Sequence, residues 1–219
     1  SSTEADWARI RFLFSDLPLD EPANINGLSP VGTGNDALTG GFLRITSSIT
    51  YPNARFYRRN NLPTSSTNSD YTNLGIIVRS SCKANSGGNF TTNQRGFSLE
   101  MDNGTNRYKI AVYITTTQIR VRDITGGSDI ATVSHDNTQG VDIVCSIGNG
   151  SKVSAWFRTM DNGGLRSYTN MVNNVTIGSA GSSAAGHIIE WGHLTYASGT
   201  VETQWNEFHV STLGSTGMG

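Results

Sequence analysis

The feature that most constrains the fold of this chain is a period-two alternation of apolar and polar residues that recurs along most of its length. In residues 7–14, for example, Ile10, Phe12 and Phe14 fall on one side of an extended chain, and Arg9 and Arg11 fall on the other. Because successive side chains of a β-strand point to opposite faces of a sheet, such a pattern places one face in a core and the other in water. No long amphipathic helix and no fixed-period repeat is visible. The chain is predicted to be all-β.

The composition agrees with this class and excludes several kinds of partner. The 219 residues include 25 Gly, 25 Ser, 25 Thr and 20 Asn, so residues suited to turns and strands make up 95 positions. Lys and Arg number 16 and Asp and Glu 17, so there is no basic footprint for nucleic acid or for an anionic membrane. No apolar run approaches the length of a spanning helix, which takes roughly 18 residues or more. We expect neither nucleic acid nor a membrane as partner.

The clearest strand pattern lies between Gly96 and Met160. It consists of about six alternating segments separated by short reversals, among them Asp102-Asn103-Gly104, which supplies the residues that a tight hairpin turn requires. Since neighbours in sequence are usually neighbours in a sheet, we expect an up-and-down meander with consecutive hairpin pairing.

Two more strands are predicted near the C-terminus, at 187–197 and 204–211, and no shift in composition marks a second domain. About a dozen strands in one domain require two packed sheets, because one sheet of that size would leave an apolar face in water. We therefore predict a single-domain antiparallel β-sandwich over residues 1–213, followed by a flexible tail at 214–219.

The order of these features resembles the concanavalin A-like jelly roll of laminin G domains, pentraxins and legume lectins. The matching segments are "GGFLRITSS", "FSLEMDNGTNRYKIAVYITTTQIRVRD", "VDIVCSIGNGSKVSAWFR" and "WNEFHVS". The resemblance implies two curved antiparallel sheets with binding sites on the concave face or the rim loops. In that family the ligands are often sugars, and calcium is often present.

A catalytic pair of carboxylates is not apparent. Glycosidases with this kind of sandwich carry Glu-x-Asp-x-x-Glu on one strand, which aims two carboxylates at the scissile bond. Here Glu100 and Asp102 match the first two acids, but Thr105 stands in place of the second Glu, after the Asn-Gly turn. We expect Glu100 and Asp102 to be the solvent-facing residues of a strand, and we predict that the protein is not an enzyme.

The last two strands suggest a sugar-binding surface. If they pair as a hairpin, Trp191 and His193 share a face with Trp205, Glu207 and His209. Aromatic rings flanked by hydrogen-bonding groups suit sugars, because the apolar face of a pyranose lies on a ring while its hydroxyl groups need donors and acceptors. The alternative is that the tryptophans belong to the core and the histidines to the surface.

One basic aromatic cluster, Arg55-Phe-Tyr-Arg-Arg59, allows two interpretations. Its arginines could bind a phosphate or an acidic sugar. More often such a segment is an edge strand that its arginines keep soluble, which is the interpretation we favour.

Metal and cysteine chemistry give weak signals. No Asp-x-Asp-x-Asp-Gly calcium loop occurs, so we predict no cofactor; scattered acids at Asp36, Asp70, Asp129 and Asp161 leave calcium as the alternative. The two cysteines, Cys82 and Cys145, both occupy core positions of their strands. We favour two buried thiols over a disulfide.

These observations favour a non-catalytic β-sandwich module on a virion surface, with a bacteriophage as the favoured particle, or otherwise outside the cell. It would bind glycans such as host surface polysaccharide, as an adhesin or receptor-binding protein does. We expect a homo-oligomer, with other virion subunits as further partners. Two alternatives stay open: a capsid decoration or tail protein that acts through protein–protein contacts, and a polysaccharide hydrolase or lyase.

Overall fold

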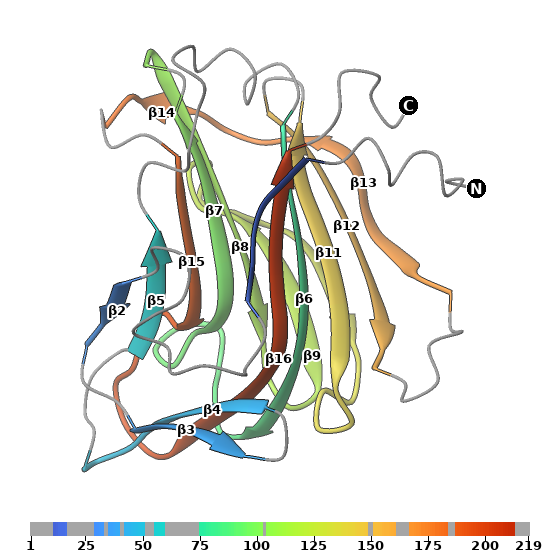
Figure 1. Cartoon of the computed structure of the whole chain (residues 1–219). Coiled ribbons are helices and arrows are strands. Elements are labelled where there is room, and N and C mark those ends of the chain that lie inside the picture. The colour runs from blue at the N-terminus through green and yellow to red at the C-terminus, as the bar shows by residue number, and fades with distance from the viewer. Residues whose placement is uncertain are drawn as a thin grey trace.

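A computed structural model shows that the described part of the chain consists of β-strands joined by turns and loops (Figure 1). Among these residues there is no helix, and so none long and apolar enough to cross a membrane. The predicted all-β class is therefore confirmed. The structure describes residues 11–16, 29–32, 35–39, 42–50, 55–59, 75–102, 104–148, 151–160, 167–183 and 187–212.

The strands form two antiparallel sheets. Sheet A has the order β13 (Thr169–Thr176), β12 (Lys152–Thr159), β11 (Val141–Gly148), β6 (Ile76–Ser86), β16 (Val201–Thr212), β4 (Phe42–Ser47) and β3 (Asn35–Thr39). An eighth strand, β1 (Arg11–Asp16), pairs with β16 beside this path. In Figure 1, β3 and β4 lie at the lower end of the sandwich, across the start of β16.

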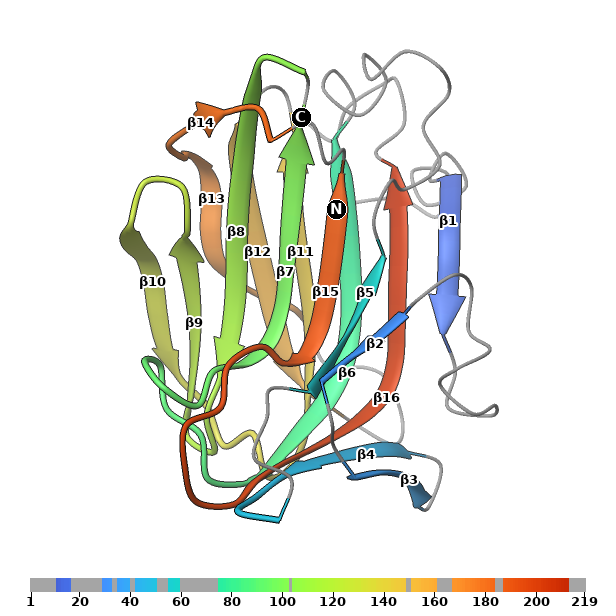
Figure 2. The same ribbon diagram turned by 90° about the vertical axis from the view of Figure 1, so that its left-hand side faces the viewer.

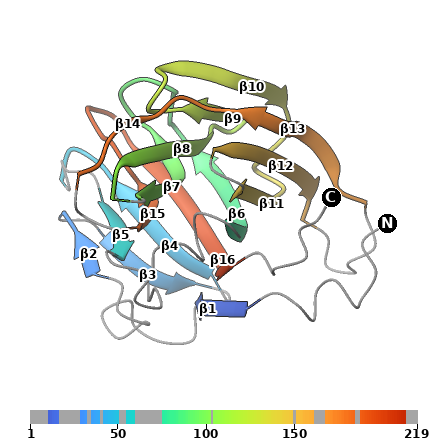
Figure 3. The same cartoon turned by 90° about the horizontal axis from the view of Figure 1, so that it is seen from above.

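Sheet B has the order β10 (Ser128–Ser134), β9 (Gln118–Asp123), β8 (Asn106–Ile114), β7 (Arg95–Asp102), β15 (Ile188–His193), β5 (Arg55–Arg59) and β2 (Ser29–Val31). The short β14 (Ala180–Gly181) pairs with the start of β8. Figure 2 shows sheet B in front of sheet A, and Figure 3 shows the two layers from above. This is the β-sandwich that the alternation predicted.

The core lies between the sheets and is filled by the apolar members of the alternating strands. On β7, Phe97, Leu99 and Met101 are at most 2% exposed and point inward. On β11 the inward residues include Ile143 and Cys145, which are fully buried. Burying these side chains contributes roughly 1.5–3 kcal/mol each. The residues between them form the outer faces of the sandwich.

The hairpin predicted at residues 102–104 forms between β7 and β8, where Asp102 pairs with Arg107. Gly104 has a φ of 85°, a left-handed conformation that glycine adopts without a steric penalty. The hairpins β8–β9 and β9–β10 follow in the same sheet, so this half of the predicted meander is confirmed.

The predicted meander is wrong at one connection, the one between β10 and β11, whereas the hairpin of β11 and β12 forms as predicted. After β10 the chain leaves sheet B, and β11 pairs with β12 and β6 in sheet A. The segment that joins them contains Asn137, which is buried and donates from Nδ2 to the carbonyl oxygens of Thr115 and Gln118 at 2.8 and 2.9 Å. This segment is thus fixed as a crossover between the sheets, which alternation within strands could not reveal.

The position of β5 corrects another prediction. The basic aromatic segment is not an edge strand, because β5 pairs with β15 on one side and with β2 on the other.

The predicted tail at 214–219 lies outside the described residues.

The two cysteines are free and buried. They lie on neighbouring strands, but Cys82 pairs with Val141 while Cys145 pairs with Val78, so they are four positions apart in register. A disulfide requires Cα atoms within about 7 Å, and this offset exceeds that reach. Two buried thiols were the favoured prediction, and it is confirmed.

Candidate functional site

The candidate site lies on the outer face of sheet B and centres on Glu190 of β15. Its neighbours Ile189 and Trp191 point into the core, so Glu190 points outward. In the register of the sheet Glu190 lies opposite Arg58 of β5 on one side and Ser98 of β7 on the other. Three strands that are distant in sequence thus bring these three polar residues into one row.

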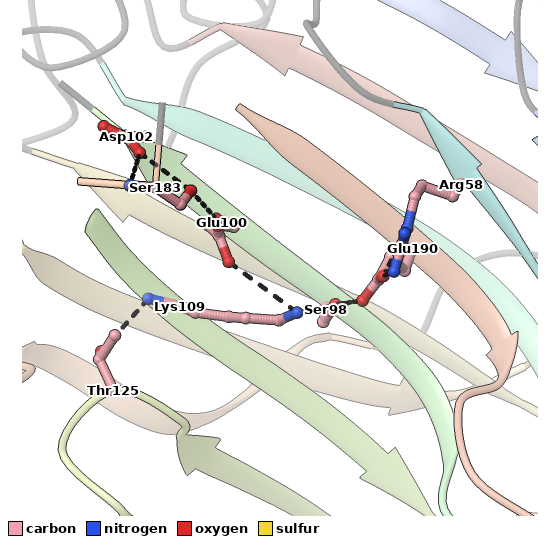
Figure 4. A network of polar contacts seen from close by, with 8 residues as sticks. All are labelled: Arg58, Ser98, Glu100, Asp102, Lys109, Thr125, Ser183 and Glu190. Carbon is pink, nitrogen blue, oxygen red and sulfur yellow. Dashed lines mark hydrogen bonds and ion pairs between the residues drawn. The ribbon is translucent and has the colours of Figure 1, made fainter. Parts of the chain in front are cut away.

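Glu190 accepts hydrogen bonds from three residues (Figure 4). Arg58 donates to Oε1 from Nε at 2.8 Å and also from Nη2. Ser98 Oγ and Lys109 Nζ donate to Oε2 at 2.8 and 3.2 Å. Charge-assisted bonds of this kind are among the stronger interactions of a protein, so the carboxylate is held in one orientation.

Lys109 of β8 extends the network to a second carboxylate. It lies directly opposite Glu100 of β7, and its Nζ is 4.0 Å from Glu100 Oε2. The side chains of Glu100 and Glu190 are only 6 and 8% exposed, whereas those of Lys109 and Arg58 are 25 and 39% exposed. We call these residues, with Ser98, the Glu190 network. Its cations are the groups that a ligand can reach.

The protonation of Glu190 follows from these contacts. Burial alone raises the pKa of its carboxyl group, but the charge of Lys109, the hydrogen bond from Ser98 and the contacts with Arg58 together outweigh burial. Its pKa is therefore held below the ordinary value, and Glu190 is ionised at neutral pH.

Asp102 adjoins the Glu190 network through Ser183, whose Oγ donates to Asp102 Oδ2 at 3.2 Å and lies 3.5 Å from Glu100 Oε1. The Asp102 carboxylate accepts hydrogen bonds from Gly104 N, Ser182 Oγ and Ser183 N at 2.9, 2.7 and 2.8 Å. These bonds tie the β7–β8 hairpin to the segment after β14. Glu100 and Asp102 do face away from the core, as predicted, but with 4 and 2% exposure they are not the solvent-facing residues we expected.

The row of residues next to Glu190 contains two glycines, Gly192 and Gly96, with Phe56 and Tyr113 on either side of them. Gly96 has a φ of 143°, and a Cβ at this position would lie 1.9 Å from the carbonyl oxygen of Val112. Only glycine fits here, because any side chain would push β7 and β8 apart.

No group of three or more His, Cys, Asp or Glu residues converges on a possible metal position within the described ranges. Of the acids considered for calcium, Asp129 pairs with Arg120 and Arg122 instead. Asp70 and Asp161 lie in segments that the structure does not describe.

No family model matches the chain, and no curated protein matches its sequence. Solved structures do match. A carbohydrate esterase from the Shiga toxin-encoding bacteriophage phi24B aligns over 94% of this chain and 100% of its own, with a TM-score of 0.55 and 15% identity. The CBM2 module of the evolved Dit of Lactobacillus casei BL23 phage J-1 aligns over 94 and 97%, with a TM-score of 0.57 and 10% identity. Lectin I-B4 from Griffonia simplicifolia aligns over 91 and 98%, with a TM-score of 0.55 and 10% identity.

The chain adopts a concanavalin A-like jelly roll. This confirms the resemblance inferred from the order of the strands. Identities of 10 to 15% establish the fold and carry no residue roles from one protein to another.

Within this jelly roll the predicted hairpin of the last two strands does not form. Trp191 and His193 belong to β15 in sheet B, whereas Trp205, Glu207 and His209 belong to β16 in sheet A. The residues between them, 194–200, cross from one sheet to the other. The five residues therefore do not share one surface, and this prediction is wrong.

The two tryptophans of that predicted surface lie in the core of the jelly roll. Trp191 and Trp205 are 3 and 2% exposed, and their ring centroids lie 5.2 Å apart. The alternative interpretation, that they are core residues, is the correct one. Neither indole offers a ring face on which a sugar could lie.

The histidines of the predicted surface are separated as well. His193 is buried, and its ring nitrogens bond to Ser47 Oγ and Thr203 Oγ1, each at 2.9 Å. A β-bulge between Trp205 and Glu207 reverses the alternation along β16, so Phe208 and Val210 point inward and His209 lies on the outer face. His209 thus faces away from Trp205.

The residues that sequence reasoning missed are those of the Glu190 network. Alternation alone places Ser98 and Glu100 on the face of their strand opposite the core. What the sequence did not contain is the order β8-β7-β15-β5, which brings Lys109 and Arg58 to the two sides of Glu190.

Proposed function

We propose that this protein is a non-catalytic glycan-binding module whose binding surface is the outer face of sheet B around the Glu190 network. The observation that carries the proposal is the pair of partly exposed cations, Arg58 and Lys109, held in fixed positions by one buried carboxylate. Their remaining N–H groups are hydrogen-bond donors of the kind that recognise sugar hydroxyl groups. Strands of a sheet hold such groups more rigidly than loops do.

The state of Glu190 supports a binding role over glycoside hydrolysis. A hydrolase needs one carboxylic acid that is protonated near neutral pH and can donate to the leaving oxygen. The pKa of Glu190 is lowered, so it does not hold that proton. Glu100, the other carboxylate of the network, lies beside the same lysine.

The matching folds support a place outside the cell or on a virion. Two of the structures above come from phage proteins, one a carbohydrate esterase and one a carbohydrate-binding module, and the third is a lectin. We infer by analogy an adhesin or receptor-binding role at a virion surface, with host polysaccharide as the ligand. A homo-oligomer would multiply a weak affinity for a repeating polymer.

The test is glycan-array binding, followed by calorimetry with the best ligand for the wild type and two lysine variants. Lys109→Met should weaken binding by at least about tenfold, since it removes a charged hydrogen-bond donor. Lys83→Met is the matched control, because Lys83 is a partly buried strand lysine of sheet A that lies over the ring of Phe42. It should bind as the wild type does.

Three outcomes would contradict the proposal. Silence across a broad array would remove the glycan-binding function and favour the structural virion protein. Binding that Lys109→Met leaves unchanged but Trp156→Ala abolishes would move the site to sheet A, where Trp156 is a partly buried indole on the outer face. Release of reducing ends or unsaturated sugars, lost in Glu100→Gln, would establish a hydrolase or lyase.

A further inference from the structure

We propose that the glycan bound on sheet B carries an acidic group, and that Arg120 and Arg122 of β9 form the subsite for it. The inference rests on the proposed function, because it assigns the class of glycan to the same face. It starts from the register of the sheet. Arg122 lies opposite Ala111 of β8, which lies opposite Ser98 of the Glu190 network. Arg122 therefore continues the row that contains Glu190, and Arg120 lies in the next row, opposite Tyr113.

The charges of this face are balanced at one end and not at the other. In the Glu190 network, two cations, Arg58 and Lys109, face two carboxylates. On β9 and β10, Arg120 and Arg122 share the single carboxylate of Asp129, at 3.0 and 2.7 Å. One positive charge of this arginine pair is therefore not neutralised by its ion-pair partner.

The arginines are held in position and can be reached. The guanidinium of Arg120 lies over the ring of Phe90, with its Cζ 4.0 Å from the ring centroid. Arg122 also donates to the carbonyl oxygen of Gly127 at 2.9 Å. Their side chains are 24 and 32% exposed. An oriented guanidinium fork binds a carboxylate or a sulfate through two parallel hydrogen bonds.

Tyr113 connects the arginine pair to the Glu190 network. It lies opposite Arg120 in the sheet, on the same outer face. Burial raises the pKa of its hydroxyl group, and the charges that act on it are those of Arg122, Glu190 and Asp129. The tyrosine thus stands between the two groups of charges, so one extended saccharide lying across the strands would meet both.

This placement differs from the one suggested by the sequence alone. The segment Arg55–Arg59 is the most basic stretch of the chain and was the candidate for an acidic sugar. In the structure Arg58 is neutralised by Glu190. Among the side chains that the structure describes on this face, the excess of positive charge lies at Arg120 and Arg122, which are separated by one residue in the alternating segment of β9.

The experiment compares acidic glycans with the same glycans after their charge is removed. Uronate-containing polysaccharides are paired with their carboxyl-reduced forms, and sulfated ones with their desulfated forms, and binding is measured by calorimetry at low ionic strength. The wild type should prefer the acidic member of a pair by at least about tenfold, the contribution of one charge-assisted contact. The preference should weaken as salt is added. Which pair responds distinguishes a carboxylate from a sulfate.

Three variants test the subsite itself. Arg122→Gln should lose the preference for the acidic form while still binding the neutral one. Asp129→Asn should strengthen binding of the acidic form, because it removes the carboxylate that competes for both arginines. Arg158→Gln is the matched control: Arg158 of sheet A also bonds to one aspartate, Asp142, through Nε at 2.8 Å. It should behave as the wild type.

The two proposals fail in different ways. If glycans bind but acidic and neutral members bind equally, or if Arg122→Gln keeps the preference, the acidic subsite is wrong and the glycan-binding function stands. If no glycan binds at all, the proposed function is wrong and the subsite is overturned with it.

Discussion

Trp191 and Trp205 face each other across the interior of the sandwich, with ring centroids 5.2 Å apart, although they come from different sheets. Trp191 also stacks on Phe208 at 5.5 Å, and Trp205 Nε1 donates to Thr203 Oγ1 at 2.9 Å. The two indoles therefore pack against each other between the sheets. Their contact explains why residues that looked like a binding surface are part of the core.

Replacing Trp205 should be costly. Trp205→Ala removes the largest fully buried side chain of the described core and leaves a cavity, so we expect a loss of about 3–5 kcal/mol in the free energy of unfolding. Urea denaturation, monitored by circular dichroism, measures this loss of stability. Trp156→Ala, in which the lost indole is partly exposed, should cost much less. Equal losses in the two variants would contradict the core assignment of Trp205.

Stability should fall in mildly acidic solution because of His193. Burial, together with the smaller effect of the charge of Arg95, lowers the pKa of this histidine from 6.5 to about 3. Below pH 6.5 the unfolded chain binds a proton that the folded chain does not, so stability is full above pH 6.5 and decreases as the pH falls toward 3. The slope is at most about 1.4 kcal/mol per pH unit for one histidine.

Urea denaturation at several pH values between 6.5 and 5 isolates this effect, because the carboxyl groups titrate mainly below that window. A His193→Gln variant, which keeps hydrogen-bonding groups near Ser47 and Thr203, should show a smaller slope. The pKa of His187 is also lowered, chiefly by burial, so part of the slope should remain. An unchanged slope in His193→Gln would show that His193 is not the group responsible.

Arg95 should be essential for stability, because it joins β7 of sheet B to β6 and β16 of sheet A. It is fully buried, and its guanidinium donates to the carbonyl oxygens of Ser86, Gly87, Ile114 and Glu202. Arg95→Met leaves buried carbonyl groups without donors, at a cost of about 1–3 kcal/mol each. We expect the free energy of unfolding, measured by urea denaturation, to fall by at least about 3 kcal/mol. Arg122→Gln, an exposed arginine variant, should lose less than about 1 kcal/mol.

The two thiols should be inert in the folded protein. Burial raises the pKa of both Cys82 and Cys145 to about 12, so almost no thiolate forms at neutral pH. A chromogenic disulfide reagent should find no reactive thiol in the native protein and both after denaturation. Ser128→Cys, at an exposed position of β10, should add one thiol that reacts at once. Rapid reaction of the native wild type would contradict the burial of the cysteines.

Much of the fold was predictable because alternation is a local property. The inward residues Phe97, Leu99 and Met101 could be assigned from their spacing, and the turn at residues 102–104 from its composition. The prediction failed where a local pattern was interrupted. The β-bulge after Trp205 reverses the alternation, so counting by twos placed Trp205 and His209 on one face when they lie on opposite faces.

The candidate site was much less predictable, because it depends on which strands pair. Glu190 and Ser98 are 92 residues apart in the chain, and Glu190 and Arg58 are 132 apart. The residues near Glu190 in the sequence do not predict that it will accept hydrogen bonds from Arg58 and Lys109. The sequence shows that the Glu-x-Asp-x-x-Glu motif is incomplete after Glu100 and Asp102, but the lysine that lies beside Glu100 could not be foreseen.

The sequence by itself determined that this chain forms strands, that most of them bury one face, and that two packed sheets result, since these follow from side-chain period and turn chemistry. Only the tertiary structure decided which strand lies beside which, because pairing between distant segments depends on the whole set of core contacts and on where the chain crosses between sheets. That choice put Trp191 and Trp205 inside, and it put Glu190 between Arg58 and Lys109 on the surface proposed to bind glycans.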